Sequence, residues 1–108
     1  MDSSEFQRRS SETLAAIEDA LDEYGPDFDY ETVNEVLTLE FADGSKIIVN
    51  KQSAADQIWV AAKSGGFHFD YDADSDSWVL DSTGAELFAE LSRLISKQSG
   101  ETFQLRRA

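Results

Sequence analysis

The stretch VLTLEFADGSKIIVN (Val36–Asn50) has the pattern of two strands joined by a tight turn. Every second residue from Leu37 to Phe41 is apolar, and this period of two is typical of a strand with one buried face. Asp43 and Gly44 then form a pair that favours a hairpin turn. The chain returns as KIIVN, so the stretch predicts an antiparallel hairpin from which a sheet can grow.

Strand patterns continue downstream of this hairpin. The segments QIWVAAK (57–63) and FHFDY (67–71) flank Ser64, Gly65 and Gly66 and predict a second hairpin. The segment SWVLD (77–81) predicts a further strand. We therefore expect a meander of five or six antiparallel strands.

An amphipathic helix is predicted before the sheet. Its apolar stripe recurs at spacings of three and four and contains Phe6, Leu14, Ile17, Leu21 and Tyr24. Ser4 and Gln7 have the spacing of a capping box at its start, and Gly25 and Pro26 are expected to end it.

A second helix is predicted after the sheet. Its apolar stripe consists of Leu87, Leu91, Leu94 and Ile95, and it is expected to end near Gly100. Thr83 and Glu86 have capping-box spacing at its start. The segment 101–108 has no clear pattern.

These elements predict an α+β fold. A chain of 108 residues is long enough for one core, so we expect a single domain over residues 1–108. An antiparallel sheet with helices at both ends of the chain can bury one face beneath both helices and leave the other in water. The expected architecture is a two-layer α/β sandwich, with both helices on one face of a five- to six-stranded sheet.

The charge of the chain is strongly negative and unevenly distributed. The net charge is −13, and residues 1–43 carry 13 acidic residues against only Arg8 and Arg9. This charge excludes nucleic acid as a partner unless the protein imitates it. Cations and basic protein surfaces are the expected partners.

The sequence contains no cysteine, which excludes disulfides, thiolate metal sites and thiol nucleophiles. The first residues lack the basic and apolar regions of a signal peptide, and no apolar run is long enough to span a membrane. We expect a soluble, cytoplasmic protein that does not act at a membrane.

Four carboxylates of the first helix fall opposite its apolar stripe: Glu18, Asp19, Asp22 and Glu23. Carboxylate oxygens one turn apart suit a hard cation, although an ordinary solvated face is the alternative. Glu18 with Asp22 is a like-charge pair at a spacing that destabilises a helix by a few tenths of a kcal/mol, and no Lys or Arg compensates. The missing compensation weakens the alternative of an ordinary solvated face.

Two other candidate metal positions are weaker. Asp72, Asp74 and Asp76 imitate the first half of a calcium loop, but Ser77 stands where that loop needs Gly and Thr83 where it needs a bidentate Glu. We interpret this segment as an acidic hairpin turn. His68 is the only histidine and is expected to be a partly exposed residue of the sheet.

Trp59 is a candidate contact residue. If Ile58 and Val60 face the core, Trp59 faces outward beside Gln57, and Asn50 of the neighbouring strand can join them. An exposed Trp in a polar patch indicates a protein contact. The alternative is a shifted register in which Trp59 is buried.

The sequence shows no catalytic constellation: it contains no recognisable Ser, His and Asp arrangement, no phosphate-binding Gly loop and no CxxC. A binding or regulatory role is favoured over a metabolic enzyme.

The sequence resembles the bacterial frataxin family, CyaY, over almost the whole chain. The resemblance rests on SEF and IEDALDE in the first helix, VLTLEFADGSKIIVNKQ, QIWVAAKSGGFHFDYD, and W, D and TG before the last helix. The order of GSKIIVN, QIWVA and GGFHF is specific. The resemblance implies the same two-helix, antiparallel-sheet fold.

The resemblance implies a protein of iron-sulfur cluster assembly rather than an enzyme. It would act as an iron donor or an iron-dependent regulator of the cysteine desulfurase complex, with iron (Fe²⁺ or Fe³⁺) weakly bound. The family's acidic positions are occupied here by Glu18, Asp19, Asp22, Glu23, Asp29 and Glu31, and Asp27 in the same loop is a weaker candidate. Ferroxidase or iron-storage activity is the alternative, and a nucleic-acid mimic without a metal role is a third hypothesis.

The resemblance also assigns a partner surface. The cysteine desulfurase and its iron-sulfur scaffold complex would contact Asn50, Gln57 and Trp59. We expect the protein to be a monomer without iron.

Two departures from the family pattern bear on these expectations. Ser82 stands where bacterial relatives often carry Arg, and Pro26 stiffens the segment after the first helix.

Overall fold

The computed structural model describes residues 1–107. The chain begins with helix α1 (Ser3–Tyr24) and, after the strands, forms helix α2 (Leu87–Ser99). Between them lie β1 (Asp29–Val33), β2 (Val36–Glu40), β3 (Lys46–Gln52), a 3₁₀ turn η1 (Ser53–Ala55), β4 (Gln57–Ala62), β5 (Gly65–Asp72) and β6 (Ser77–Leu80). In the part of the chain that the structure describes, no helix combines the length and the hydropathy needed to cross a membrane.

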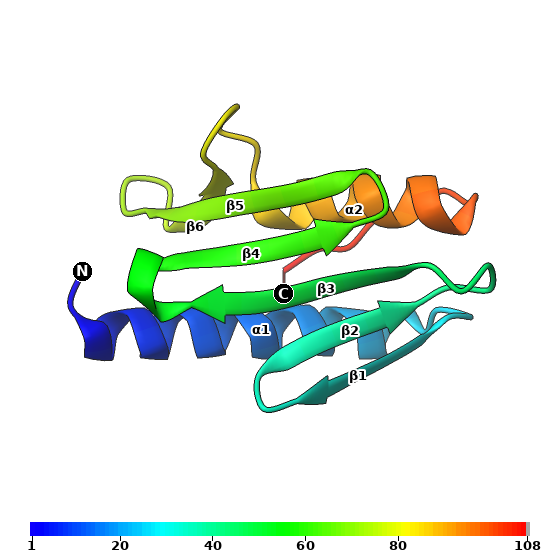
Figure 1. The fold of residues 1–108 in the computed structure, drawn as a ribbon, viewed down its shortest axis with the longest axis horizontal. Coiled ribbons are helices and arrows are strands. Elements are labelled where there is room, and N and C mark those ends of the chain that lie inside the picture. The colour runs from blue at the N-terminus through cyan, green and yellow to red at the C-terminus, as the bar shows by residue number, and fades with distance from the viewer. Residues whose placement is uncertain (108) are drawn as a thin grey trace.

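The strands form one antiparallel sheet in the order of the sequence, β1 to β6. Both helices lie on the same face of this sheet, α1 beside β1 to β3 and α2 beside β4 and β5 (Figure 1). The predicted α+β, two-layer architecture is therefore confirmed.

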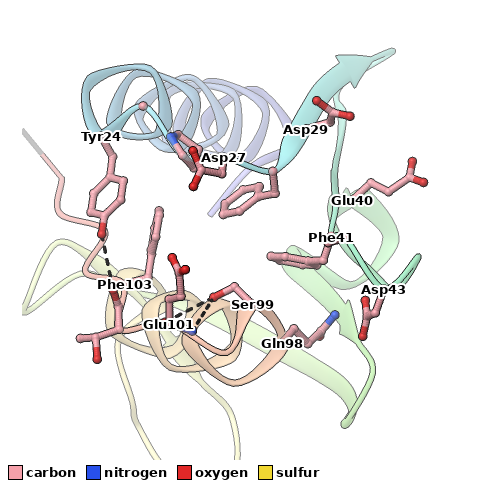
Figure 2. Close-up of a pocket in the computed structure, with 15 residues that line it drawn as sticks. Tyr24, Asp27, Asp29, Glu40, Phe41, Asp43, Gln98, Ser99, Glu101 and Phe103 are labelled. Carbon is pink, nitrogen blue, oxygen red and sulfur yellow. Dashed lines mark hydrogen bonds between the residues drawn. The ribbon is translucent and has the colours of Figure 1, made fainter.

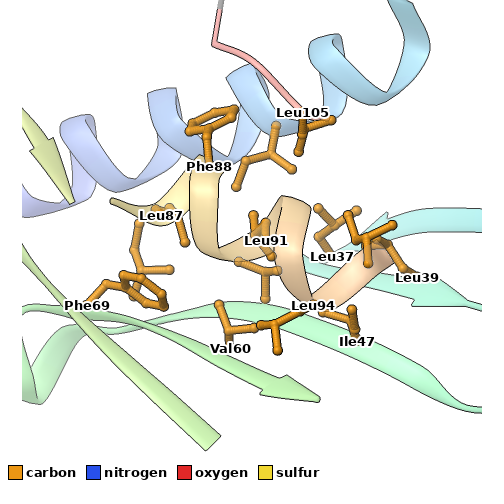
Figure 3. Packing of buried hydrophobic residues seen from close by; sticks show 14 of the residues in the cluster. Leu37, Leu39, Ile47, Val60, Phe69, Leu87, Phe88, Leu91, Leu94 and Leu105 are labelled. Carbon is orange, nitrogen blue, oxygen red and sulfur yellow. The ribbon is translucent and has the colours of Figure 1, made fainter. Parts of the chain in front are cut away.

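The alternation of the strands decides which face is covered. Leu37 and Leu39 of β2 are buried, as are Ile58 and Val60 of β4, whereas the residues between them are only partly buried. Helix α2 adds a layer of leucines, and Figure 3 shows Leu94 next to Val60 and Ile47 of the sheet. The core thus lies between the sheet and the two helices.

The segment after α2 completes the core. Phe103 and Leu105 are buried, and the chain runs back between the two helices (Figures 1 and 3). Ser96 Oγ accepts a hydrogen bond from the Phe103 amide at 2.9 Å, and Ser92 Oγ accepts one from the Leu105 amide at 2.8 Å. The sequence pattern does not reveal this segment, because only two apolar residues mark it.

Both predicted helix starts are wrong. Asp2, not Ser4, caps α1, because its carboxylate accepts the Glu5 amide hydrogen bond at 2.8 Å. Glu86 itself caps α2 by accepting from the amides of Phe88 and Ala89, while Thr83 Oγ1 accepts from the Ala85 amide in the preceding turn. In both places a carboxylate accepts from the free amides of the first turn, where the helix dipole favours an acidic side chain.

Two further expectations need correction. The segment after α1 is not a loop up to Glu31, because Asp29–Val33 forms the edge strand β1. Tyr24 closes the predicted apolar stripe but is 47% exposed, since α1 ends there and its ring packs on Phe103 instead of the sheet. The helix end itself is as predicted: Gly25 has φ +67° and its amide donates to the Leu21 carbonyl.

A buried hydrogen bond joins α1 to the edge strand β6. The indole Nε1 of Trp78 on β6 donates to Thr13 Oγ1 at 2.9 Å, and the Thr13 hydroxyl donates to the Arg9 carbonyl. Thr13 is 1% exposed and Trp78 is 2% exposed. Neither group can turn to water if its partner is lost.

Replacing Thr13 with Val should therefore reduce the free energy of unfolding by about 1–3 kcal/mol, the cost of a buried donor without a partner. The change keeps the shape of the side chain, so packing is nearly unaffected. Urea denaturation measures the difference. Thr38→Val on the water-facing side of β2 is the control and should stay within about 0.5 kcal/mol of wild type. An equal effect of both changes would contradict the role of this hydrogen bond.

Candidate functional site

The carboxylates in the N-terminal half of α1 are paired with bases. Glu12 lies 3.4 Å from Arg8, and Glu5 lies 3.7 Å from Arg9. Arg9 also packs over the ring of Tyr71, which fixes its side chain against β5. This half of the helix is electrically balanced.

The C-terminal half of α1 carries uncompensated negative charge. We call Glu18, Asp19, Asp22 and Glu23 the acidic ridge; Glu18 is half-buried and the other three are exposed. Within residues 1–107, none of the four lies within 4.0 Å of a basic side chain. The last turn contains no basic residue, so the partial negative charge of the helix C-terminus adds to the repulsion.

The ridge meets the sheet at Tyr30 of β1. The Tyr30 hydroxyl donates a hydrogen bond to the Asp22 carboxylate. This bond, desolvation, and the charges of Asp22 and Glu18 raise the pKa of Tyr30 above its ordinary value of 10.0. Sequence reasoning missed Tyr30, because no periodicity links a residue of one element to a carboxylate of another.

The remaining predicted iron residues lie apart from the ridge. Asp27 lies in the connection between α1 and β1. Asp29 pairs with Glu40 and Glu31 with Thr38 across β1 and β2, and these partners are on the face of the sheet away from the helices. Tyr30 between them points toward the helix layer, so the edge strand separates two groups of carboxylates.

The described part of the chain contains no preformed metal-binding site. Within residues 1–107, no three His, Asp or Glu side chains are close enough together to hold a metal ion. Asp72 and Asp76, which resemble part of a calcium loop, accept hydrogen bonds in and near their own turn, from Ser75 and from Tyr71 respectively.

Trp59 faces away from the helices, as predicted. Its neighbours Ile58 and Val60 are 0% and 1% exposed, and Trp59 itself is partly exposed on the opposite face. Its indole Nε1 donates to Gln57 Oε1 at 2.8 Å, and Asn50 lies directly across the β3–β4 pair. The three residues predicted as a partner patch thus share one surface.

Two residues that the sequence analysis did not assign to this patch hold it in place. The ring of His68 stacks on Trp59 with centroids 4.4 Å apart and planes inclined by 19°. The Asp70 carboxylate accepts a hydrogen bond from Gln57 Nε2 at 2.9 Å. His68 is partly exposed, as expected, with 45% of its side chain accessible. The ring stack and the hydrogen bond to Gln57 restrict the indole, which limits the rotamer entropy that Trp59 still has to lose on contact with a partner.

The sequence matches a family model described as a frataxin-like domain over residues 1–101. It is similar to proteins named iron-sulfur cluster assembly protein CyaY. The relative from Dechloromonas aromatica is 49% identical over 107 residues, covering 98% of this chain and 100% of the relative. The relative from Vibrio vulnificus is 44% identical over 102 residues, covering 94% of this chain and 96% of the relative.

The fold is similar to solved frataxin structures. Frataxin from Psychromonas ingrahamii superposes with a TM-score of 0.89 at 36% identity, covering 99% of this chain and 100% of that one. Trimeric frataxin from Saccharomyces cerevisiae, complexed with ferrous iron, gives a TM-score of 0.73 at 29% identity, covering 86% and 87% of the two chains.

The contact between Tyr30 and Asp22 predicts how the pKa of Tyr30 should respond to substitution. Asp22→Asn should move the pKa of Tyr30 down toward 10.0, because the negative charge that disfavours the phenolate is removed. Asp76→Asn is the control and should lower only the pKa of Tyr71, which Asp76 raises by accepting its hydroxyl hydrogen bond. The ¹³Cζ resonances of the three tyrosines, followed against pH, separate the two effects.

Stability should follow the same titration. Because the folded-state pKa of Tyr30 exceeds the unfolded value, this contribution to the unfolding free energy is complete below pH 10 and is lost as pH rises through the folded pKa. Asp22→Asn should weaken this loss. A Tyr30 resonance that titrates identically in wild type and in Asp22→Asn would contradict the assignment.

Proposed function

The chain belongs to the frataxin-like family, and on this basis we propose that it is a cytoplasmic iron-binding protein of iron-sulfur cluster assembly. It would act as an iron donor or an iron-dependent regulator of the cysteine desulfurase complex. Its relatives carry the name of assembly proteins, and the yeast frataxin has been solved with ferrous iron.

The observation that carries this proposal is the uncompensated acidic ridge. The fold balances the carboxylates of the N-terminal half of α1 and leaves those of the C-terminal half without bases. Exposed carboxylate oxygens are ligands for a hard cation, and a bound cation would relieve the repulsion between them.

Iron on the ridge would be weakly bound. The ligands sit on flexible exposed side chains, so water retains part of the coordination sphere and each ligand loses rotamer entropy on binding. Asp22 also shares its carboxylate with the Tyr30 hydroxyl, so a metal must share or displace that hydrogen bond. Both effects favour a protein that carries and releases iron over one that retains it.

The same charge would attract a basic protein surface. Asp29 and Glu31 lie on the outer face of the sheet together with Asn50 and Trp59. We propose that the desulfurase complex contacts this face at the Trp59 patch while a basic part of it reaches the carboxylates around β1. Iron and the partner then compete for, or share, the same charges.

Ferrous iron added under anaerobic conditions should broaden the amide NMR signals of α1 near the ridge and of Asp27 to Glu31, and few others. Changing Glu18, Asp19, Asp22 and Glu23 to their amides should remove the broadening. The charge-matched control changes four aspartates away from the ridge to Asn: Asp72 at the end of β5, and Asp56, Asp74 and Asp81 in turns. It should keep the broadening.

Broadening that persists unchanged in the ridge variant, or that is lost equally in the control, would contradict an iron site on the ridge. Oxygen consumption measured with the same samples distinguishes iron binding from the alternative of ferroxidase activity. Repeated turnover of ferrous iron that the ridge variant abolishes would favour the enzyme.

The affinity for a cysteine desulfurase should differ with and without ferrous iron, because Asp29 and Glu31 are predicted iron ligands and are also the carboxylates that a basic part of the partner would reach. Trp59→Ala should weaken the complex by about 2 kcal/mol in both conditions, since an aromatic anchor is lost but no charge changes. Gln104→Ala, on the helix side of the molecule, is the control and should have little effect. Calorimetric titration measures the wild type and both variants with and without iron, and equal wild-type affinities in the two conditions would contradict the shared surface.

A further inference from the structure

A cavity of about 540 Å³ opens at the end of the molecule where α1, β2 and α2 all terminate (Figure 2). Its walls come from the α1–β1 connection, the β2–β3 turn and the chain after α2. This volume lies in the range of cavities that bind small molecules in proteins. None of the residues of the acidic ridge lines it.

A row of four aromatic rings runs along this cavity. Tyr24 packs on Phe103 with centroids 3.9 Å apart, Phe103 lies 5.6 Å from Phe28, and Phe28 lies 4.8 Å from Phe41. Phe28 is partly buried and Tyr24 is 47% exposed, so ring surface is accessible at the opening. Aromatic rings attract a cation at their faces and an apolar group over any part of their surface.

The charged side chains that line the cavity are all negative. Its lining contains the carboxylates of Asp27, Asp29, Glu40, Asp43 and Glu101 and no Lys, Arg or His. Asp27 and Glu101 lie on opposite sides of the opening, from the α1–β1 connection and from the chain after α2 (Figure 2). Hydrogen bonds from Ser45 and the charge of Lys63, 3.6 Å away, hold the pKa of Asp43 below its usual value, so Asp43 is ionised near neutral pH.

We propose that this cavity binds a small organic cation with an aromatic or apolar body. Anionic molecules are repelled by the carboxylates, and a neutral molecule gains only the contact with the rings. A hard metal ion such as Mg²⁺ gives up its water reluctantly and makes no apolar contact with the rings. Only a molecule that combines an apolar body with a positive charge uses both features of the lining.

This inference does not depend on the proposed iron role. Asp27 and Asp29 belong to both residue sets, but Glu40, Asp43, Glu101 and the aromatic row do not belong to the predicted iron site. The test therefore uses Glu40 and Glu101, whose replacement leaves every predicted iron ligand in place.

The probes are phenethylammonium, its neutral analogue 2-phenylethanol, the anion 3-phenylpropionate, and Mg²⁺, each titrated into the protein at constant ionic strength and followed by amide NMR. Phenethylammonium should shift the signals of Gly25, Ala42 and Thr102 saturably and bind at least about fivefold more tightly than 2-phenylethanol. The anion should give no saturable shift, and Mg²⁺ should not displace phenethylammonium.

Two variants separate charge from ring contact. Glu40→Gln with Glu101→Gln should weaken phenethylammonium about threefold and leave 2-phenylethanol unchanged, since only charge is removed. Tyr24→Leu should weaken both, because an exposed ring is lost while an apolar side chain still covers Phe103. Asp72→Asn with Asp74→Asn removes the same charge from a distant turn and should change neither.

Three results would overturn the proposal. The first is equal affinity for phenethylammonium and 2-phenylethanol. The second is displacement of phenethylammonium by Mg²⁺. The third is a shift pattern centred on the ridge instead of on the cavity, which would mean that the cation senses only the general negative charge of the surface.

Discussion

The inward side chains of the six strands all point to the same face of the sheet, and the two helices and the C-terminal segment cover that face. Burial of an aliphatic or aromatic side chain contributes about 1.5–3 kcal/mol, so this one face contains the main source of stability. The opposite face contributes little to the core and is free to carry Trp59, His68 and the outer carboxylates of β1. One face of the sheet thus supplies the core, and the other carries exposed side chains.

Helix α1 shows the same division within one element. Its inner side is buried, its Thr13 accepts the buried hydrogen bond of Trp78, and Lys51 of β3 donates to Gln7 and Ser11. Against these contacts the repulsion of the ridge is small, since each exposed like-charge pair costs a few tenths of a kcal/mol. The helix can therefore tolerate a strongly negative C-terminal half. Such a surface is available to cations and basic partners because folding does not use it.

The ends of the elements create the remaining features. At the β1 edge, Tyr30 connects the ridge to the sheet through Asp22, while Asp29 and Glu31 project on the other face, which also carries Trp59. At the C-terminal end of α1, the chain after α2 brings Phe103 against Tyr24 and Phe28. These rings line the cavity. The proposed iron, partner and organic-cation surfaces are therefore adjacent and overlap at the carboxylates around β1, while Glu18, Trp59 and Glu101 each belong to one surface only and can be substituted separately.

Local periodicity in the sequence was sufficient to predict both helices, five of the six strands and the outward direction of Trp59, because these depend on spacing between neighbours along the chain. It also placed Glu18, Asp19, Asp22 and Glu23 on one helix face. It missed β1, where carboxylates on the wet face of an edge strand resemble a loop, and it missed the buried segment at Phe103 and Leu105. The Tyr30–Asp22 contact, the His68–Trp59 stack and the cavity were decided by tertiary structure alone, because each needs side chains from different elements to meet across the packed layers.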